Sequence, residues 1–327
     1  MLTLTSPDAP AATVKSERRR SRLGTVRARD DAKWFRILTF PWLAGFVLLS
    51  LLPLVVGLFI SFTNYNGVNP AGAKFVGAAN YVRAFEDPNV AQAAGRTLVF
   101  AVMYLPLSFV IALALALLVN AGPKVRGLFR SLYYLPAVVP LVGAAFIWRA
   151  LFNRDSGLIN GFLTSINPAW NIPWLDEFAT PVLTSMSLWL SLGLSTVLYL
   201  AALQSVPIEL EQAATVDGAN YFQRLRHVIF PLISPVVFYQ ILIALIYALG
   251  VTMEPILLGS PSPQSVATSV PNDNVFLNVY TYQQMFANQR FGYASALLWL
   301  TTVGAVLITV VLFATKKRWV HSESGNI

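Results

Sequence analysis

The chain has 327 residues, of which 56% are hydrophobic and only 12% are charged. A soluble protein carries about a quarter charged residues, so this composition indicates a membrane protein. Cysteine is absent, which excludes disulfides and thiolate metal sites, and two histidines are too few for a histidine-rich metal centre. The formal charge of +8 would suggest nucleic-acid binding in a soluble protein, but in a membrane protein it is typical of the positive-inside rule.

The chain begins with a polar, arginine-rich stretch that precedes an apolar run. We predict that residues 1–35 form a disordered basic tail, because they lack apolar periodicity. The run at 36–62 exceeds the roughly 20 apolar residues that a membrane span needs, so we predict a first transmembrane helix there. It is too long and too far from the terminus for a cleaved signal peptide.

We predict an extracytoplasmic polar loop at 63–95, a transmembrane core at 96–315 and a short tail at 316–327. Within the core, apolar runs predict further spans at about Thr97–Asn120, Leu132–Leu151, Val182–Leu203, Leu232–Leu257 and Phe291–Thr315. The expected fold is therefore an all-α polytopic membrane protein with six transmembrane helices.

The basic residues indicate the orientation of these spans. With six spans, both termini lie on one side, together with the loops at 121–130 and 206–235. That side holds seventeen of the 23 Lys and Arg residues, and the other side holds six. The bias predicts that both termini are cytoplasmic.

The longest polar interruption late in the chain, residues 206–235, separates two of the apolar runs. It is much longer than a plain turn between helices requires. Pro207 suits the first position of a helix, and the acidic Glu209 suits its first turn. Gly218 suits a left-handed helix end, and a second short helix is expected to begin near Asn220. We therefore predict a helix–turn–helix segment in water, which we call the elbow.

The elbow permits two interpretations, an amphipathic loop on lipid headgroups or a docking surface for a cytoplasmic partner. The residue pattern favours the second. It resembles the cytoplasmic loop of MetI-like ABC importer permeases, which is roughly Glu-Ala-Ala, two residues, Asp-Gly-Ala, and later Leu-Pro. The matching positions are Ala213-Ala214, Asp217-Gly218-Ala219, Leu225, Val228, Phe230-Pro231 and the trailing Pro235. One position departs from the pattern: Gln212 stands where the family has Glu, and Glu211, one residue earlier, points about 100° away around a helix.

A shorter resemblance lies after the first predicted span. Phe75-Val76-Gly77 and Asn80-Tyr81 are similar to a motif of maltose- and glycerol-3-phosphate-type permeases. That motif belongs to the first member of the usual permease pair.

The resemblance implies one of two membrane subunits of a binding-protein-dependent carbohydrate importer in a bacterial-type inner membrane. Its partners would be a second homologous permease, two ATPase subunits and an extracytoplasmic substrate-binding protein. The chain itself lacks a GxxxxGK(S/T) loop, so it would be no enzyme, with no catalytic residue, metal or cofactor of its own and ATP used by the partner. The residues implied in coupling to the ATPase are Glu211, Gln212, Ala213, Ala214, Asp217, Gly218, Ala219, Phe222, Leu225 and Pro231.

In this interpretation Ala213 and Ala214 permit close packing, Asp217-Gly218 shapes the turn, and Phe222 and Leu225 are apolar anchors in the partner's groove. ATP-driven closure of the ATPases would move the elbow and rotate the helical bundles in alternating access.

Aromatic and amide side chains suit sugar recognition, because a sugar presents apolar faces and many hydroxyls. Candidates for the substrate path are Trp189, Tyr199, Tyr239, Gln240, Tyr247, Glu254 and Asn288. Each is also consistent with ordinary packing or an interfacial belt. Glu254 and Arg149 are the charged residues within the apolar runs, and either is a snorkelling charge or a cavity wall. An acidic residue often occurs near the position of Glu254 in the family.

A phosphate-bearing substrate would require cations in the cavity, and Arg149 is the one candidate. We therefore predict a neutral sugar or oligosaccharide, with glycerol-3-phosphate or another polyol-type substrate as the alternative. A stand-alone secondary transporter is a second alternative, but it would typically carry more intramembrane ionisable residues. A scaffold or insertase subunit, which needs no substrate cavity, is a third.

Overall fold

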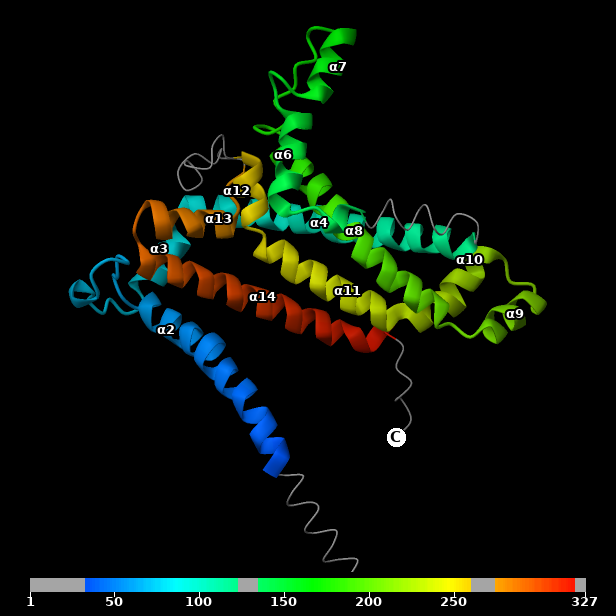
Figure 1. The fold of residues 1–327 in the computed structure, drawn as a ribbon, viewed down its shortest axis with the longest axis horizontal. Coiled ribbons are helices and arrows are strands. Elements are labelled where there is room, and N and C mark those ends of the chain that lie inside the picture. Colours follow the sequence, from blue (N-terminus) through cyan, green and yellow to red (C-terminus); the bar gives the residue numbers. More distant parts are fainter. Residues whose placement is uncertain (1–32, 123–134, 260–273, 321–327) are drawn as a thin grey trace, which may run out of the picture. The chain divides into compact units, whose positions relative to one another are not determined.

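A computed structural model describes residues 33–122, 135–259 and 274–320 (Figure 1). These residues form helices, and among them the extended structure amounts to one isolated bridge between Thr63 and Phe75. Five helices are long and apolar enough to span a membrane. They cover Lys33–Ser61, Pro88–Asn120, Ala179–Gln204, Tyr221–Gly250 and Phe291–Lys316. The chain is thus a polytopic helical membrane protein, as its composition predicts.

The chain divides into two units, residues 1–59 and 60–327. In the first unit, the helix that begins at Lys33 buries none of the residues in its most apolar window. It includes a π-helical turn, η1 (Val47–Leu51), directly before α2 (Leu52–Ser61). Pro53 accounts for this wide turn, because a proline ring clashes with the carbonyl four residues before it.

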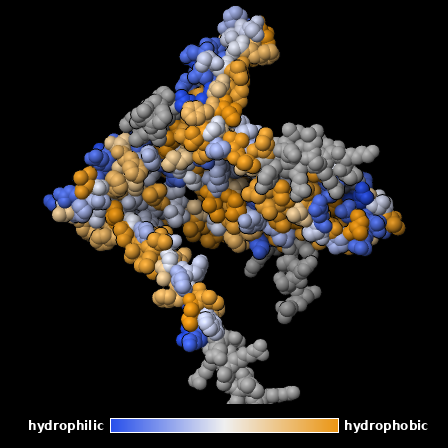
Figure 2. Space-filling view, viewed as in Figure 1, coloured by the Kyte–Doolittle hydropathy of each residue, from blue (hydrophilic) through white to orange (hydrophobic). Residues whose placement is uncertain are grey.

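Four long helices form the body of the second unit. They are α4 (Pro88–Ala121), α8 (Ala179–Gln204), α11 (Phe230–Gly250) and α14 (Phe291–Trp319). Helix α4 packs along α8 and α11, and α11 also packs against α14 (Figure 1). Hydrophobic residues cover the middle of this bundle, and hydrophilic residues gather near α9 and α10 (Figure 2).

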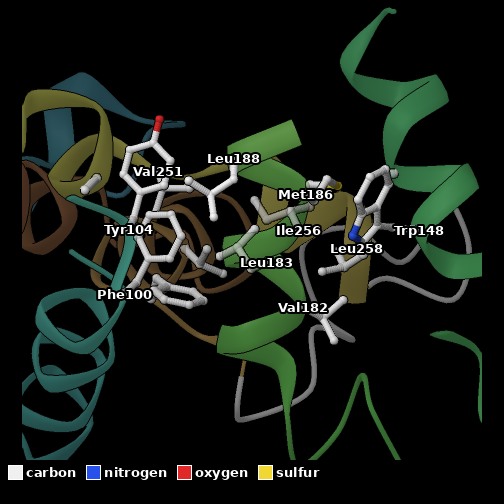
Figure 3. Close-up of a cluster of buried hydrophobic side chains, with 14 of the residues drawn as sticks. Phe100, Tyr104, Trp148, Val182, Leu183, Met186, Leu188, Val251, Ile256 and Leu258 are labelled. Carbon is white, nitrogen blue, oxygen red and sulfur yellow. The ribbon is translucent and has the colours of Figure 1, made fainter. Parts of the chain in front are cut away.

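Two buried clusters hold the bundle together. The first lies where α4 and α8 meet α6 (Leu141–Phe152), α12 (Met253–Gly259) and α13 (Leu277–Tyr282), and Figure 3 shows Phe100, Leu183 and Ile256 pointing into it. The second lies toward the elbow, where Ala112 and Ala116 of α4 face Tyr199 of α8. Small residues let helices approach closely, which is how helices associate in lipid.

Shorter helices flank the bundle. They include α3 (Ala79–Glu86), α7 (Leu158–Ile166) and η6 (Gln283–Ala287). Helix α3 and the first turns of α4 occupy the segment 63–95, which the sequence analysis expected to be a loop. Asn80 explains part of the motif found there: its amide donates to the carbonyls of Ser61 (2.9 Å) and Thr63 (2.8 Å), at the end of the first apolar helix.

Two predicted spans are interrupted. The run Leu132–Leu151 is not one helix, because the helix breaks before Pro140 and α6 then covers only Leu141–Phe152. Pro140 is extended (ψ 142°) and cannot donate to a preceding carbonyl. The run Leu232–Leu257 is likewise divided, since α11 ends at Gly250 and α12 restarts at Met253. Most of the predicted basic tail, most of the loop at 121–130 and residues 321–327 lie outside the described ranges.

Candidate functional site

The first half of the elbow is helix α9 (Ile208–Val216), with Pro207 at its N-cap and Glu209 and Glu211 in its first turn. The helix ends as predicted, because Gly218 has a φ of +81°. The Gly218 N–H donates to the carbonyl of Thr215 (3.1 Å) and the Ala219 N–H to that of Ala214 (2.9 Å). These two bonds form a Schellman motif, so this turn depends on a residue that tolerates left-handed geometry.

The second half of the elbow restarts at Asn220, as predicted. Asn220 and Gln223 form a reciprocal capping box at the start of α10 (Tyr221–Arg224), with distances of 3.0 and 2.8 Å. The Arg224 guanidinium donates to the hydroxyl of Thr215 (2.6 Å) and so ties α10 to α9. A π-helical segment, η3 (Leu225–Ile229), then leads into α11.

The predicted coupling residues divide by exposure. Gln212, Ala213, Asp217, Gly218 and Phe222 are exposed. The half-buried members are Glu211, Ala214, Ala219, Leu225 and Pro231. Leu225 packs against the cluster that holds Tyr199 and Ile233, so it anchors the elbow to its own chain. Phe222, in contrast, is 78% exposed.

A cavity of about 420 Å³ lies between α4, α8, α11 and α12. Residue Leu141 of α6 and Ala137 also line it. Its polar wall consists of Tyr104, Ser108, Ser187, Ser191, Ser195, Tyr199, Gln240, Tyr247 and Glu254. The structure therefore brings four of the seven predicted path residues together, Tyr199, Gln240, Tyr247 and Glu254.

Two features of this polar wall are specific. The Tyr247 hydroxyl lies 3.1 Å from Ser187 Oγ and 3.1 Å from Glu254 Oε1, which joins α8, α11 and α12. Gln240 is buried, with 8% of its surface exposed, and its Nε2 has no hydrogen-bond partner in the described part of the chain. A buried amide donor without a partner is costly, so this donor is available to a bound polar group.

Three predicted path residues lie elsewhere. Trp189 packs on Trp148, with ring centroids 4.9 Å apart, and Tyr239 is exposed on the outside of α11. Asn288 lines a different cavity at the opposite end from the elbow. These three therefore do not line the first cavity, and their place in a substrate path stays a prediction.

The sequence analysis did not identify a row of serines on α8 that forms part of the cavity wall. Ser187, Ser191 and Ser195 line this wall, and Ser187 accepts a hydrogen bond from the Tyr247 hydroxyl of α11. Their spacing of four residues places them on one face of α8, and that periodicity is the signal that could have assigned them to a cavity. Tyr104 gave no comparable signal.

The second cavity, about 570 Å³, is polar and lies between α3, the start of α4, α13 and η6. Asp87 lines this cavity, and its Oδ2 accepts hydrogen bonds from Tyr280 (2.6 Å) and Tyr293 (2.9 Å). Burial opposes ionisation of Asp87, but these bonds and those from Asn89 outweigh it and lower the pKa of Asp87. Burial and then the bond to Asp87 raise the pKa of Tyr280 to about 12.

Apolar spans around a cavity with polar groups in its wall, with a structured elbow at one end, are typical of membrane transport proteins. Comparison with known families agrees. Residues 105–319 match the family described as "Binding-protein-dependent transport system inner membrane component". The chain belongs to this family, and it is a multi-pass inner-membrane permease component.

Relatives are similar over most of the chain. A probable ABC transporter permease protein YesP of Bacillus subtilis is 32% identical over 289 residues, covering 87% of this chain and 90% of YesP. AmyD of Thermoanaerobacterium thermosulfurigenes, a probable starch degradation products transport system permease, is 28% identical over 294 residues. The match covers 88% of this chain and 96% of AmyD. The sn-glycerol-3-phosphate permease UgpA of Yersinia enterocolitica is 34% identical, but over 54% of this chain and 60% of UgpA.

The fold is also that of a solved transporter. A chain of a bacterial ABC transporter involved in the import of the acidic polysaccharide alginate superposes with a TM-score of 0.75 at 24% identity. The match covers 91% of this chain and 99% of the other. The same transporter was solved with an alginate pentasaccharide-bound periplasmic protein.

Proposed function

We propose that this permease forms half of the translocation path of an ATP-driven importer for a sugar or oligosaccharide. A second, homologous permease would form the other half. An extracytoplasmic binding protein would deliver the substrate, and two separate subunits would hydrolyse ATP. The sequence supports this division of labour, because it carries no nucleotide-binding loop of its own.

The elbow is the proposed dock for an ATPase subunit, and its surface is the observation that carries the proposal. Val216 (88% exposed) and Phe222 (78% exposed) are its two most exposed large apolar side chains. They lie on either side of the ordered turn at Gly218. An exposed aromatic on a rigid turn is the kind of anchor that fills a partner's pocket.

The proposed topology has six spans with the termini and the elbow in the cytoplasm. Five long helices and the short apolar helix α6 support it, together with the excess of basic residues on the elbow side. A broken span at α6 is compatible with a membrane because irregular backbone is tolerated where it borders a cavity. Leu141, the first residue of α6, does line one.

The cavity is the proposed substrate path. Its tyrosine rings offer apolar surface to a sugar face, and its hydroxyl, amide and carboxylate groups offer partners to sugar hydroxyls. Two similar proteins are described as transporting starch degradation products and alginate, which also supports a carbohydrate. UgpA supports the alternative of glycerol-3-phosphate, for which this wall supplies no cation.

The test is co-purification of ATP hydrolysis with the tagged chain from its native membranes. We compare the wild type with Phe222→Ala and with Phe162→Ala, because Phe162 is a similarly exposed phenylalanine (67%) on α7, away from the elbow. We expect Phe222→Ala to lower the ATPase activity that co-purifies by about tenfold or more. Phe162→Ala should leave that activity unchanged. If no ATPase accompanies the wild type, the stand-alone transporter becomes the better explanation.

A further inference from the structure

The cavity wall carries charge of a single sign. Of the described residues that line it, Glu254 is ionisable as an acid, and none is Lys, Arg or His. Arg149, the other charged residue of the apolar runs, lies in the last turn of α6 and is not part of this wall. The charge of the wall therefore depends on one side chain.

Glu254 is held toward the cavity by the architecture around it. The chain breaks after Gly250 and restarts at Met253, so Glu254 falls in the first turn of α12. Pro255 and Ile256, which follow it, are buried and fix this turn in place. The Tyr247 hydroxyl binds Oε1 of Glu254, and the described residues supply no other hydrogen bond to this carboxylate. A carboxylate has room for about four, so most of its acceptor capacity is free for a ligand.

Gln240 of α11, which lines the same cavity, supplies a hydrogen-bond donor to complement this acceptor. Its Nε2 donor is buried and unpartnered in the described part of the chain. One sugar hydroxyl can accept from this amide and another can donate to the carboxylate of Glu254, because a hydroxyl is both donor and acceptor. The Glu254 carboxylate repels an anionic sugar, and this repulsion is strongest where water is scarce.

We propose that Glu254 is a specificity-determining residue that makes this path selective for uncharged or cationic carbohydrates and excludes anionic ones such as uronates and sugar phosphates. This inference rests on the proposed function for the identity of the ligand as a carbohydrate. The charge selection itself belongs to the cavity and can be measured without a known substrate. The proposal therefore predicts a selectivity different from that of relatives described as carrying alginate or sn-glycerol-3-phosphate.

The absence of cysteine from the sequence permits a direct test. In the purified complex, Ser191→Cys places this chain's single thiol on the cavity wall, one helical turn from Ser187. Ser165→Cys places a matched thiol on the exposed surface of α7. Each is treated with cationic, anionic and neutral methanethiosulfonate reagents, and the cation-to-anion ratio of rates at Ser191→Cys is divided by that at Ser165→Cys.

We expect a normalised ratio of about ten or more, since a low-dielectric cleft concentrates ions of opposite charge. Glu254→Gln, which keeps the size of the side chain, should bring the ratio close to one, and Glu254→Lys should invert it. A ratio near one with Glu254 present, or a ratio that Glu254→Gln leaves unchanged, overturns the proposal. So does a thiol that the neutral reagent fails to reach, because a hydrated sugar would then be excluded too.

The outcome is separable from that of the proposed function. Loss of the charge ratio with the ATPase still bound contradicts the selectivity alone. A strong ratio in a complex that lacks any ATPase leaves the charge selection in place and contradicts the importer assignment.

Discussion

The hydroxyl of Tyr247 lies 3.1 Å from Oε1 of Glu254, across the break that separates α11 from α12. The same hydroxyl lies 3.1 Å from Ser187 of α8. A phenol carries one proton, so it can donate to one of these oxygens at a time. The break after Gly250 places Glu254 in the first turn of α12, within hydrogen-bond distance of this hydroxyl.

Tyr247→Phe should weaken both stability and transport. The ring still packs on Tyr104, with centroids 5.2 Å apart in the wild type, but the donor to Glu254 is lost. Removing a hydrogen bond to a charged group costs about 1.5–3 kcal/mol, so the midpoint of thermal unfolding should fall by several degrees. Tyr239→Phe is the matched control, because Tyr239 is exposed on the same helix. Equal midpoints for the two variants would show that the Tyr247 bond contributes nothing measurable.

How much of this arrangement the sequence could predict depends on the range of the interactions involved. The hydrogen bonds at Gly218 and Asn220 join residues three to five positions apart, so residue type alone located the end of α9 and the start of α10. The break at Pro140 was not predicted, because prolines occur within membrane helices and their effect depends on neighbouring helices. Helix α4 illustrates this, since it continues through Pro106.

The cavity required more than local information. Tyr199, Gln240 and Tyr247 were singled out for their chemistry, but Trp189 and Tyr239 have equally suitable chemistry and lie elsewhere. What separates the two groups is which face of α8 or α11 points inward. Both helices are apolar nearly all round, so hydrophobic periodicity could not reveal that face, and on α8 the four-residue spacing of the serines was the available signal.

Asp87 should make the stability of the chain dependent on pH in the acidic range. Its pKa is lower in the folded chain, because the hydrogen bonds from Tyr280, Asn89 and Tyr293 outweigh burial. Its contribution is therefore complete above the ordinary aspartate pKa of about 3.9 and is lost as the pH falls through the lowered folded value. Asp87→Asn should destabilise the chain near neutral pH, with the difference from wild type shrinking below about pH 4.

Thermal unfolding of both chains across this pH range measures the effect. Glu86→Gln is a suitable control, because Glu86 lines the same cavity without receiving the tyrosine bonds. If the difference between Asp87→Asn and wild type is constant from neutral pH to pH 3, the bonds to Asp87 do not depend on its charge.

Gly292 should be intolerant of even one added methyl group. It lies in the first turn of α14, and its N–H donates to the carbonyl of Tyr65 (2.9 Å). A Cβ at this position would overlap the backbone oxygen of Thr63, which cannot move freely because the Asn80 amide binds it. We expect Gly292→Ala to cost about 1–3 kcal/mol, as overpacking does.

Gly304→Ala provides the matched comparison on the same helix. A Cβ at Gly304 meets no atom within 4 Å. Because alanine is favoured over glycine in a helix by about 1 kcal/mol, this substitution should be neutral or stabilising. Unfolding of the two variants in the same detergent decides the matter, and similar midpoints would mean that the contact between Gly292 and Thr63 relaxes at little cost.

Substitution of Gly218 should be limited by its backbone geometry and not by the volume of the added side chain. A Cβ at Gly218 meets no atom within 4 Å, yet its φ is +81°. Holding an L-residue in left-handed geometry costs about 1–2 kcal/mol, which corresponds to a factor of about 5–30 in the population of the ordered turn. Gly218→Ala should therefore reduce ATPase retention by about that factor, and Gly218→Asn should reduce it less, since Asn tolerates this geometry. Gly161→Ala on α7 is the control, because its surroundings are equally open and its φ is not positive. If Gly218→Ala retains the ATPase as well as Gly161→Ala does, then binding of the partner depends on the side chains of the elbow and not on the geometry of its turn.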